Sequence, residues 1–127
     1  MMQTTQYSTL DLAPPADLDR QVAQALNEDL GEGDLTAELI PLKTEASGVL
    51  MTREAMTVCG MPWVEAVFRQ LDPQVRLAWQ VREGAQVAAD EVLCHLHGPA
   101  RAILSGERTA LNFLQTLSAT ATHTGTE

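Results

Sequence analysis

The sequence predicts an α+β domain in which helices pack on a mostly antiparallel sheet of four to five strands. Segments with helical spacing and segments of alternating apolar residues follow each other as helix, two strands, helix, two or three strands, helix. This order differs from the regular βαβ repeat of parallel sheets. The chain has 127 residues, 45% of them hydrophobic, which suits one domain with an ordinary core.

The first 41 residues predict a leader, a helix and a turn. Residues 1–15 are polar and end in two prolines, so we expect a flexible leader ahead of a single domain over residues 16–127. Residues 16–30 predict a helix because apolar side chains recur at helical spacing and Gly31 follows. The glycine-rich segment that comes next is expected to turn, with a short helical turn capped by Asp34. The apolar positions of the helix are Leu18, Val22, Ala25, Leu26 and Leu30.

The middle of the chain predicts two short strands, a helix and two longer strands. Residues 46–54 and 56–60 are rich in β-forming side chains. Residues 61–72 carry Pro62 near the start and apolar side chains on one face, which is typical of a helix. Residues 75–84 and 92–98 alternate apolar and polar side chains, and each run ends at a glycine. Both therefore predict half-buried strands.

The last helix is predicted from the break at Gly98–Pro99 to about Thr122, and it has two distinct faces. Arg108, Asn112 and Gln115 lie at i, i+4 and i+7 and share one face. One cation beside two amides can bind a carboxylate, although a solvated helix face has the same spacing. The apolar stripe consists of Ile103, Ala110, Leu114, Leu117 and Ala121.

Two further residues of this helix carry expectations about its local structure. Ser105 is expected to cap a segment that starts at Gly106. Glu107 lies roughly along the apolar stripe, so its carboxylate needs a partner or a position near the helix start.

Composition narrows the classes of function. The net charge of −9 disfavours binding to phosphate backbones, so we expect no nucleic-acid partner. No apolar run is long enough to cross a bilayer, and the first residues lack the pattern of a secretory signal. Cys59 and Cys94 form no CxxC motif and fit reduced structural thiols. We therefore expect a cytoplasmic protein without a membrane partner.

The stretch LSGERTALNFLQTLSATATHT, residues 104–124, resembles the signature of the quinolinate phosphoribosyltransferases. That signature is roughly G-E-R-T-A-L-N, an apolar turn, and then S-G-x-A-T. Three earlier stretches resemble the same family in the same order: ALNEDLGEGDLTAELIP, TREAMTVCGMPWVEAVFRQLD and WQVREGAQV. The resemblance covers about residues 22–122, and the ordered set of motifs makes it specific.

The resemblance implies a fold and an activity. The family joins an N-terminal, hammerhead-like α+β domain to a C-terminal α/β barrel. It converts quinolinate and phosphoribosyl pyrophosphate, with Mg²⁺, to nicotinate mononucleotide, pyrophosphate and CO2 in NAD biosynthesis. Its members are dimers or larger homo-oligomers, with the active site between one subunit's N-terminal domain and the partner's barrel. The chain thus corresponds to the N-terminal domain and the start of the interdomain helix, with the barrel absent.

The resemblance also assigns roles to individual residues. Arg108 is expected to reach the partner subunit's site and to contact a quinolinate carboxylate, with Asn112 and Gln115 supporting it. Glu107 and Thr109 are expected to be nearby structural or supporting residues. No catalytic residue and no metal ligand is expected in this part of the enzyme.

The chain departs from the family pattern at three places. Ala119 stands where the signature has glycine, and Asp90 stands where a hairpin glycine is usual. Residues 123–127 match no family segment.

Two further groups of residues are candidate metal sites, but their spacing supports a metal site only weakly. Glu28, Asp29 and Asp34 near glycines suggest a metal loop, but their spacing matches no EF-hand, and helix-capping acids are the commoner explanation. His95 and His97 project from one strand face without an evident third ligand, so surface or interface histidines are the commoner explanation than a metal pair.

Three more features leave alternatives open. Cys59 lies in an apolar run and is expected to be a buried, inert thiol. Arg53 and Glu54 either pair across a hairpin or face a partner subunit. The hairpin at residues 81–98 resembles that of a biotinyl or lipoyl carrier, but the only lysine, Lys43, lies outside it.

Two alternative functions remain beside the enzyme. One is a non-catalytic interaction module used for dimer contacts. The other is a relative of the same architecture that is linked to molybdate transport and acts on another substrate.

Overall fold

The computed structural model describes residues 16–30 and 39–125, with side chains described through residue 119. The predicted leader and the turn at Asp34 lie outside this range. The elements in chain order are α2 (Leu18–Leu30), β1 (Glu45–Met51), β2 (Met56–Thr57), α4 (Met61–Leu71), β3 (Arg76–Trp79), β4 (Gln86–Val87), β5 (Val92–Pro99) and α5 (Ala100–Gly125).

The strands of the described residues form two antiparallel sheets. One has three strands in the order β1-β5-β3, and the other pairs β2 with β4. The α+β class with antiparallel strands is confirmed, but the five strands are divided between two sheets. The division follows from the chain leaving the larger sheet early: β1 has a register shift between Leu50 and Met51, and β3 ends at Trp79.

The strand predicted over residues 75–84 is shorter than expected. Only Arg76–Trp79 pairs with β5, because the chain then turns toward the smaller sheet. There the Gly84 N–H donates to the Val58 carbonyl, and the Val58 N–H donates to the Ala85 carbonyl. Gly84 has a φ of 88°, a conformation that glycine adopts without steric cost. The expected alternation nevertheless holds along this segment, since Val75 is buried and Arg76 is exposed.

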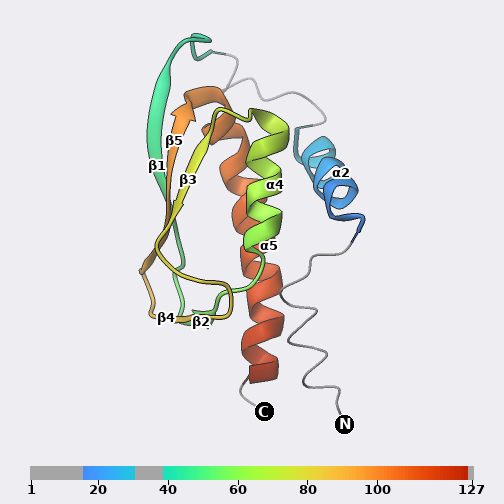
Figure 1. Ribbon diagram of the computed structural model, residues 1–127, viewed down its shortest axis with the longest axis vertical. Helices are drawn as coiled ribbons and strands as arrows, with labels where there is room; N and C mark the ends of the chain where they lie inside the picture. The colour runs from blue at the N-terminus through green and yellow to red at the C-terminus, as the bar shows by residue number, and fades with distance from the viewer. Residues whose placement is uncertain (1–15, 31–38, 126–127) are drawn as a thin grey trace.

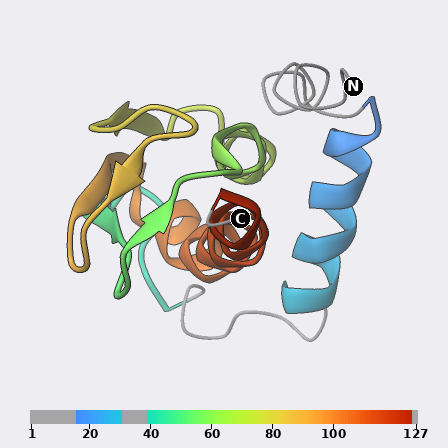
Figure 2. The ribbon, with the colours of Figure 1, turned by 90° about the horizontal axis from the view of Figure 1, so that it is seen from below.

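Helix α5 lies at the centre of the molecule. It packs on α4, on α2 and on strands β1, β2 and β5, so that the sheets lie on one side of it and α2 lies on the other (Figures 1 and 2). The apolar stripe predicted for this helix is confirmed by the burial of Ile103, Ala110 and Leu114. The largest fully buried side chains are those of Phe68, Leu50, Leu93, Leu96 and Leu114.

The close approach of α4 and α5 depends on Gly106. A Cβ atom at this position would lie 2.7 Å from both Leu71 Cδ1 and Phe68 Cε1. Phe68 is fully buried, so its ring has little room to move away. The glycine of the G-E-R-T segment is therefore required by packing between the two helices.

The prediction that Ser105 caps a helix starting at Gly106 is wrong. Helix α5 begins at Ala100 and continues through Ser105 without a break. Pro99 ends β5, and the Ala100 N–H donates to the Thr44 carbonyl at 2.9 Å. The helix start is thus stabilised by the segment before β1, five residues earlier than the proposed cap.

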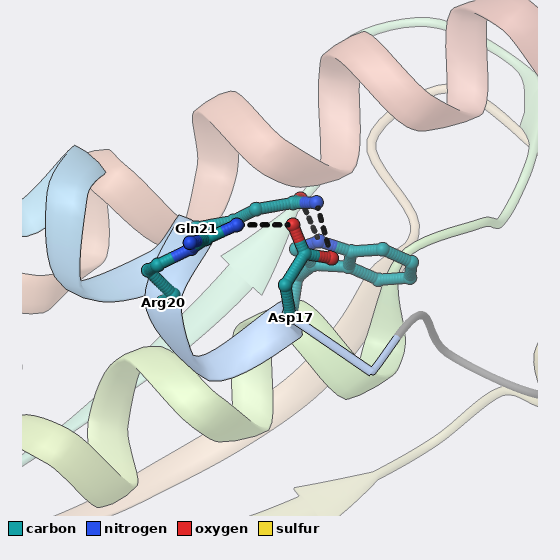
Figure 3. Close-up of polar contacts among 4 residues, drawn as sticks. Asp17, Arg20 and Gln21 are labelled. Atoms are coloured by element: carbon teal, nitrogen blue, oxygen red, sulfur yellow. Dashed lines mark hydrogen bonds and ion pairs between the residues drawn. The ribbon is translucent and has the colours of Figure 1, made fainter.

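The start of α2 is held by Asp17 and Gln21. The Asp17 carbonyl accepts a hydrogen bond from the Gln21 N–H at 3.0 Å, and the Asp17 carboxylate accepts one from the Gln21 side-chain amide at 3.1 Å (Figure 3). Gln21 in turn accepts a hydrogen bond from the Trp63 indole, which connects α2 with α4. The hydrogen bond from Gln21 lowers the pKa of the Asp17 carboxyl, and Arg20 lowers it further.

We expect Gln21→Ala to raise the pKa of Asp17 toward its ordinary value. The folded-state pKa is depressed, so Asp17 stabilises the fold above its ordinary pKa, and this contribution is lost as the pH falls through the lowered value. A carboxyl NMR titration measures the change, and Gln24→Ala, one turn farther along α2, is the control. Equal Asp17 titrations in both variants would contradict the assignment.

The two cysteines differ in environment. Cys94 of β5 is fully buried, and this burial raises the pKa of its thiol to about 11. Cys59 is half-buried, which corrects the expectation of a fully buried thiol there.

We expect iodoacetamide at pH 8 to modify Cys59 at least about tenfold faster than Cys94 in the folded protein. A thiol with a pKa near 11 has only about one thiolate in a thousand molecules at this pH. Peptide mapping after timed alkylation measures both rates, and alkylation in denaturant provides the reference. Equal rates in the folded state would contradict the buried position of Cys94.

Candidate functional site

The structure brings the predicted face of the last helix together as one surface. Arg108, Asn112 and Gln115 are exposed and line an open groove of about 410 Å³ along α5. The other lining residues are Leu104, Glu107 and Leu111. The shared face is confirmed, while the role of each residue remains a prediction.

The groove combines one cation with amides and apolar side chains. Within the described residues, no carboxylate lies within ion-pair distance of Arg108, so its guanidinium can accept an external anion. A guanidinium binds a carboxylate through two parallel hydrogen bonds, and the amides of Asn112 and Gln115 can donate to further oxygens. Leu104, which is 42% exposed, and Leu111 offer apolar contact to a ring. The arrangement suits a small carboxylated aromatic molecule.

Glu107 turns away from Arg108. Its Oε2 atom would lie 4.0 Å from a Cβ atom at Gly48 of β1. Neighbouring residues of a helix do not face each other, so this carboxylate does not neutralise the guanidinium directly. The expectation that Glu107 follows the apolar stripe agrees with its half-buried position on the sheet side of the groove.

Thr109 is anchored behind the groove. Its side chain is only 1% exposed, and its hydroxyl donates a hydrogen bond of 2.5 Å to Asp29 Oδ2 of α2. The sequence suggests a metal ligand or a helix-capping acid at Asp29 and does not predict its contact with Thr109. The two residues are 80 positions apart, so no local pattern indicates their pairing.

A second hollow lies on the other side of α5. It has a volume of about 300 Å³ and lies between α2, α4 and α5. Asn112 lines both this hollow and the groove with Arg108, and Asp29 and Thr109 line the hollow. The turn of α5 that carries Arg108 therefore has open space on both sides.

Two polar contacts hold the start of α4 against the rest of the domain. The Ser118 hydroxyl accepts from the Cys59 N–H at 2.9 Å and donates to the Cys59 carbonyl at 3.1 Å. The Glu83 carboxylate accepts hydrogen bonds from the N–H groups of Gly60 and Met61 at the N-terminus of α4. A carboxylate is favourable there because the helix dipole is positive at this end. Sequence reasoning missed both contacts because each joins residues that are far apart in the chain.

Two departures from the family pattern have structural explanations. Ala119 is exposed on α5, so its methyl group points to the surface of the described chain. Asp90 has a φ of 65° in the turn between β4 and β5. This left-handed conformation is usual for glycine and is tolerated by aspartate.

Of the two histidines suggested as a metal pair, His97 has polar partners on the neighbouring strand β1. His97 Nδ1 lies 2.9 Å from the Ser47 hydroxyl, and its Nε2 lies 3.3 Å from the Glu45 carboxylate. His95 is exposed on the same face of β5. Over residues 16–30 and 39–125, the structure contains no group of three or more His, Cys, Asp or Glu side chains that fits a metal ion.

The structure also places Arg53, Glu54 and Lys43, whose roles the sequence leaves open. Arg53 and Glu54 are exposed in the turn after β1, where the Thr52 hydroxyl bonds to the Glu54 backbone. Lys43 is exposed ahead of β1, away from the β4–β5 hairpin. None of the helices in the described ranges combines the length and apolar character that a bilayer-spanning helix needs.

Comparisons with known proteins agree on one family. A family model described as quinolinate phosphoribosyl transferase, N-terminal domain, matches residues 34–118. The quinolinate phosphoribosyltransferase (decarboxylating) 2, mitochondrial, of Nicotiana glauca is 34% identical over 128 residues, covering 96% of this chain and 36% of the relative. The probable nicotinate-nucleotide pyrophosphorylase (carboxylating) of Bacillus subtilis (strain 168) is 36% identical over 97 residues, covering 76% and 34%.

A solved structure agrees with the sequence comparisons. The nicotinate-nucleotide pyrophosphorylase from Francisella tularensis matches 86% of this chain with a TM-score of 0.80 and 38% sequence identity. The match covers 40% of that structure. The chain thus spans between about a third and two fifths of the length of these relatives.

Proposed function

The chain belongs to the quinolinate phosphoribosyltransferase family, and on that premise we propose that it is the substrate-facing N-terminal domain of a phosphoribosyltransferase. The enzyme joins quinolinate to the ribose phosphate of phosphoribosyl pyrophosphate and releases pyrophosphate and CO2, giving nicotinate mononucleotide for NAD biosynthesis. The observation that carries this proposal is the groove of α5. It presents the guanidinium of Arg108, which has no ion-pair partner among the described residues, beside Asn112 and Gln115 within the family's signature segment.

The groove has the chemistry that a dicarboxylated pyridine requires. Arg108 would hold one carboxylate through a charge-assisted, bidentate contact, and the amides of Asn112 and Gln115 would orient the molecule. Holding the dianion in one pose brings its ring nitrogen to the sugar carbon in the orientation needed for displacement of pyrophosphate. In this proposal the chain binds and orients the substrate, and it supplies no acid, base or nucleophile.

The proposal includes a partner subunit. Arg108 lies on an exposed face of α5, so the groove is open toward a second surface that can complete the site. We propose a homodimer or a larger homo-oligomer in which this face meets the partner's barrel domain. The net charge of this chain, −9, would complement a basic barrel that binds the phosphate groups of phosphoribosyl pyrophosphate. We expect the enzyme to work in the cytoplasm, where its two cysteines stay reduced.

Magnesium enters this proposal together with the second substrate. Phosphoribosyl pyrophosphate is used as its Mg²⁺ complex by enzymes of this family, as the sequence resemblance implies.

An assay of product formation tests the proposed function. Quinolinate, phosphoribosyl pyrophosphate and Mg²⁺ are supplied to the 127-residue chain and to the product of the full reading frame that contains it. We expect nicotinate mononucleotide from the full product and none from the 127-residue chain. A folded full product that is inactive with quinolinate, or a 127-residue chain that is active alone, would overturn the proposal.

A further inference from the structure

The carboxylate of Asp29 occupies an electrostatically unfavourable position within its own helix. Asp29 lies in the last turn of α2, where the negative end of the helix dipole disfavours a negative charge. Its Oδ2 atom accepts the hydrogen bond from Thr109, whose side chain is buried on α5. The hydrogen bond to Thr109 of α5 therefore offsets the electrostatic cost of placing this carboxylate in the last turn of α2.

The hydrogen bond between Asp29 and Thr109 connects α2 directly with α5. At the other end of α2, the side-chain contacts of Asp19 and Gln21 go to α4 instead. Beside the bond, the hollow of about 300 Å³ separates the helices, so apolar packing does not fill this part of the contact. The hydrogen bond thus adds a polar link between the last turn of α2 and α5, beside the packing of Leu26 and Leu30 on the core.

Thr109 directly follows the residue that faces the groove. Successive residues of a helix are about 100° apart around its axis, so Thr109 points into the domain while Arg108 points outward. Asn112 lies between them around the axis, and it lines both the hollow and the groove. Gly106 and Ala110 anchor the opposite flank of α5 by packing. On the flank with open space, the bond to Asp29 anchors the helix.

We propose that Asp29 is a positioning residue that acts through Thr109 to hold Arg108 and Asn112 in the orientation that binds quinolinate. The inference rests on the proposed function, because it assigns a purpose to the position of Arg108. It also gives a role to the aspartate of the glycine-rich E-D-x-G-x-G-D segment, which neither the metal-loop nor the capping hypothesis explained. A displacement of a binding group by a fraction of an ångström lowers binding markedly without removing any contacting atom.

Kinetics of the full reading-frame product test this role. We expect Asp29→Ala and Thr109→Val each to raise the KM for quinolinate about tenfold, with the KM for phosphoribosyl pyrophosphate changed less than about twofold. Asp29→Asn keeps an acceptor and Thr109→Ser keeps a donor, so both are expected to restore most of the affinity. Glu28→Gln, a neighbouring carboxylate that lines the same hollow, is the matched control and is expected to change neither constant.

A mutant cycle with Arg108 separates positioning from general stability. In the Arg108→Ala background, Asp29→Ala is expected to add less than about threefold to the quinolinate KM, because the guanidinium is gone and only Asn112 remains to be positioned. A full additional tenfold effect in that background would overturn the inference. So would equal rises in both Michaelis constants, or a variant that unfolds, since the contact would then serve the fold alone.

The same experiment distinguishes failure of the inference from failure of the proposed function. If Arg108→Ala raises the quinolinate KM while Asp29→Ala does not, only the role of Asp29 is wrong. If Arg108→Ala itself leaves this KM unchanged, the assignment of the groove fails, and the role of Asp29 fails with it.

Discussion

Replacing Arg108 by alanine is expected to raise the quinolinate KM of the full reading-frame product by about 30- to 1000-fold. This range corresponds to the loss of roughly 2–4 kcal/mol from a charge-assisted, bidentate contact. Because the Arg108 side chain is exposed and makes no described ion pair, the fold should be unaffected. Steady-state kinetics with each substrate varied, together with a thermal melt, measure both expectations.

Two variants sharpen this test. Arg108→Lys keeps the charge but loses the planar fork, so it should recover only part of the affinity. Arg82→Ala removes an exposed arginine outside α5 and should leave the quinolinate KM unchanged. An Arg108→Ala enzyme with normal kcat and normal quinolinate KM would show that the groove does not bind this substrate.

Replacing Gly106 is expected to have the largest effect on stability. In an ordinary helix, alanine in place of glycine stabilises by about 1 kcal/mol. Here the added methyl group would meet Leu71 Cδ1 and Phe68 Cε1 at 2.7 Å, and overpacking of this kind costs about 1–3 kcal/mol. We therefore expect Gly106→Ala to lower the free energy of unfolding and Gly106→Val to lower it further. Urea denaturation measures both changes.

A compensating substitution provides the control for Gly106. Phe68→Leu removes the ring that the new methyl group would contact. Combined with Gly106→Ala, it should cost less than the sum of the two single changes, because the cavity and the added methyl group partly cancel. A Gly106→Ala protein that is more stable than the parent would contradict the described packing of α4 on α5.

Local patterns predicted the helices and the face of the candidate site. The helices are recognised from residues three and four positions apart, and the same spacing places Arg108, Asn112 and Gln115 on one face of α5. The local sequence predicts the wrong start for this helix, because serine is a residue type that often caps helices. The actual start depends on Thr44, which lies more than fifty residues earlier.

The features that the sequence pattern does not predict depend on tertiary contacts. The alternation through residues 75–84 is real, but the strand ends at Trp79 because the chain pairs next with β2. The side-chain contacts of Asp29 with Thr109 and of Glu83 with the start of α4 join distant segments. One sequence contains no signal for such pairs, since each residue has an equally good local explanation as a helix-end or turn acid.

The central claim is that this chain can serve as the N-terminal domain that completes a quinolinate-binding site. A chimera tests it most directly, with this chain replacing the matching N-terminal segment of the Francisella tularensis nicotinate-nucleotide pyrophosphorylase. We expect the chimera to form nicotinate mononucleotide from quinolinate and phosphoribosyl pyrophosphate at a rate within about tenfold of the parent enzyme. A chimera that folds and assembles like the parent but forms no nicotinate mononucleotide would contradict the claim.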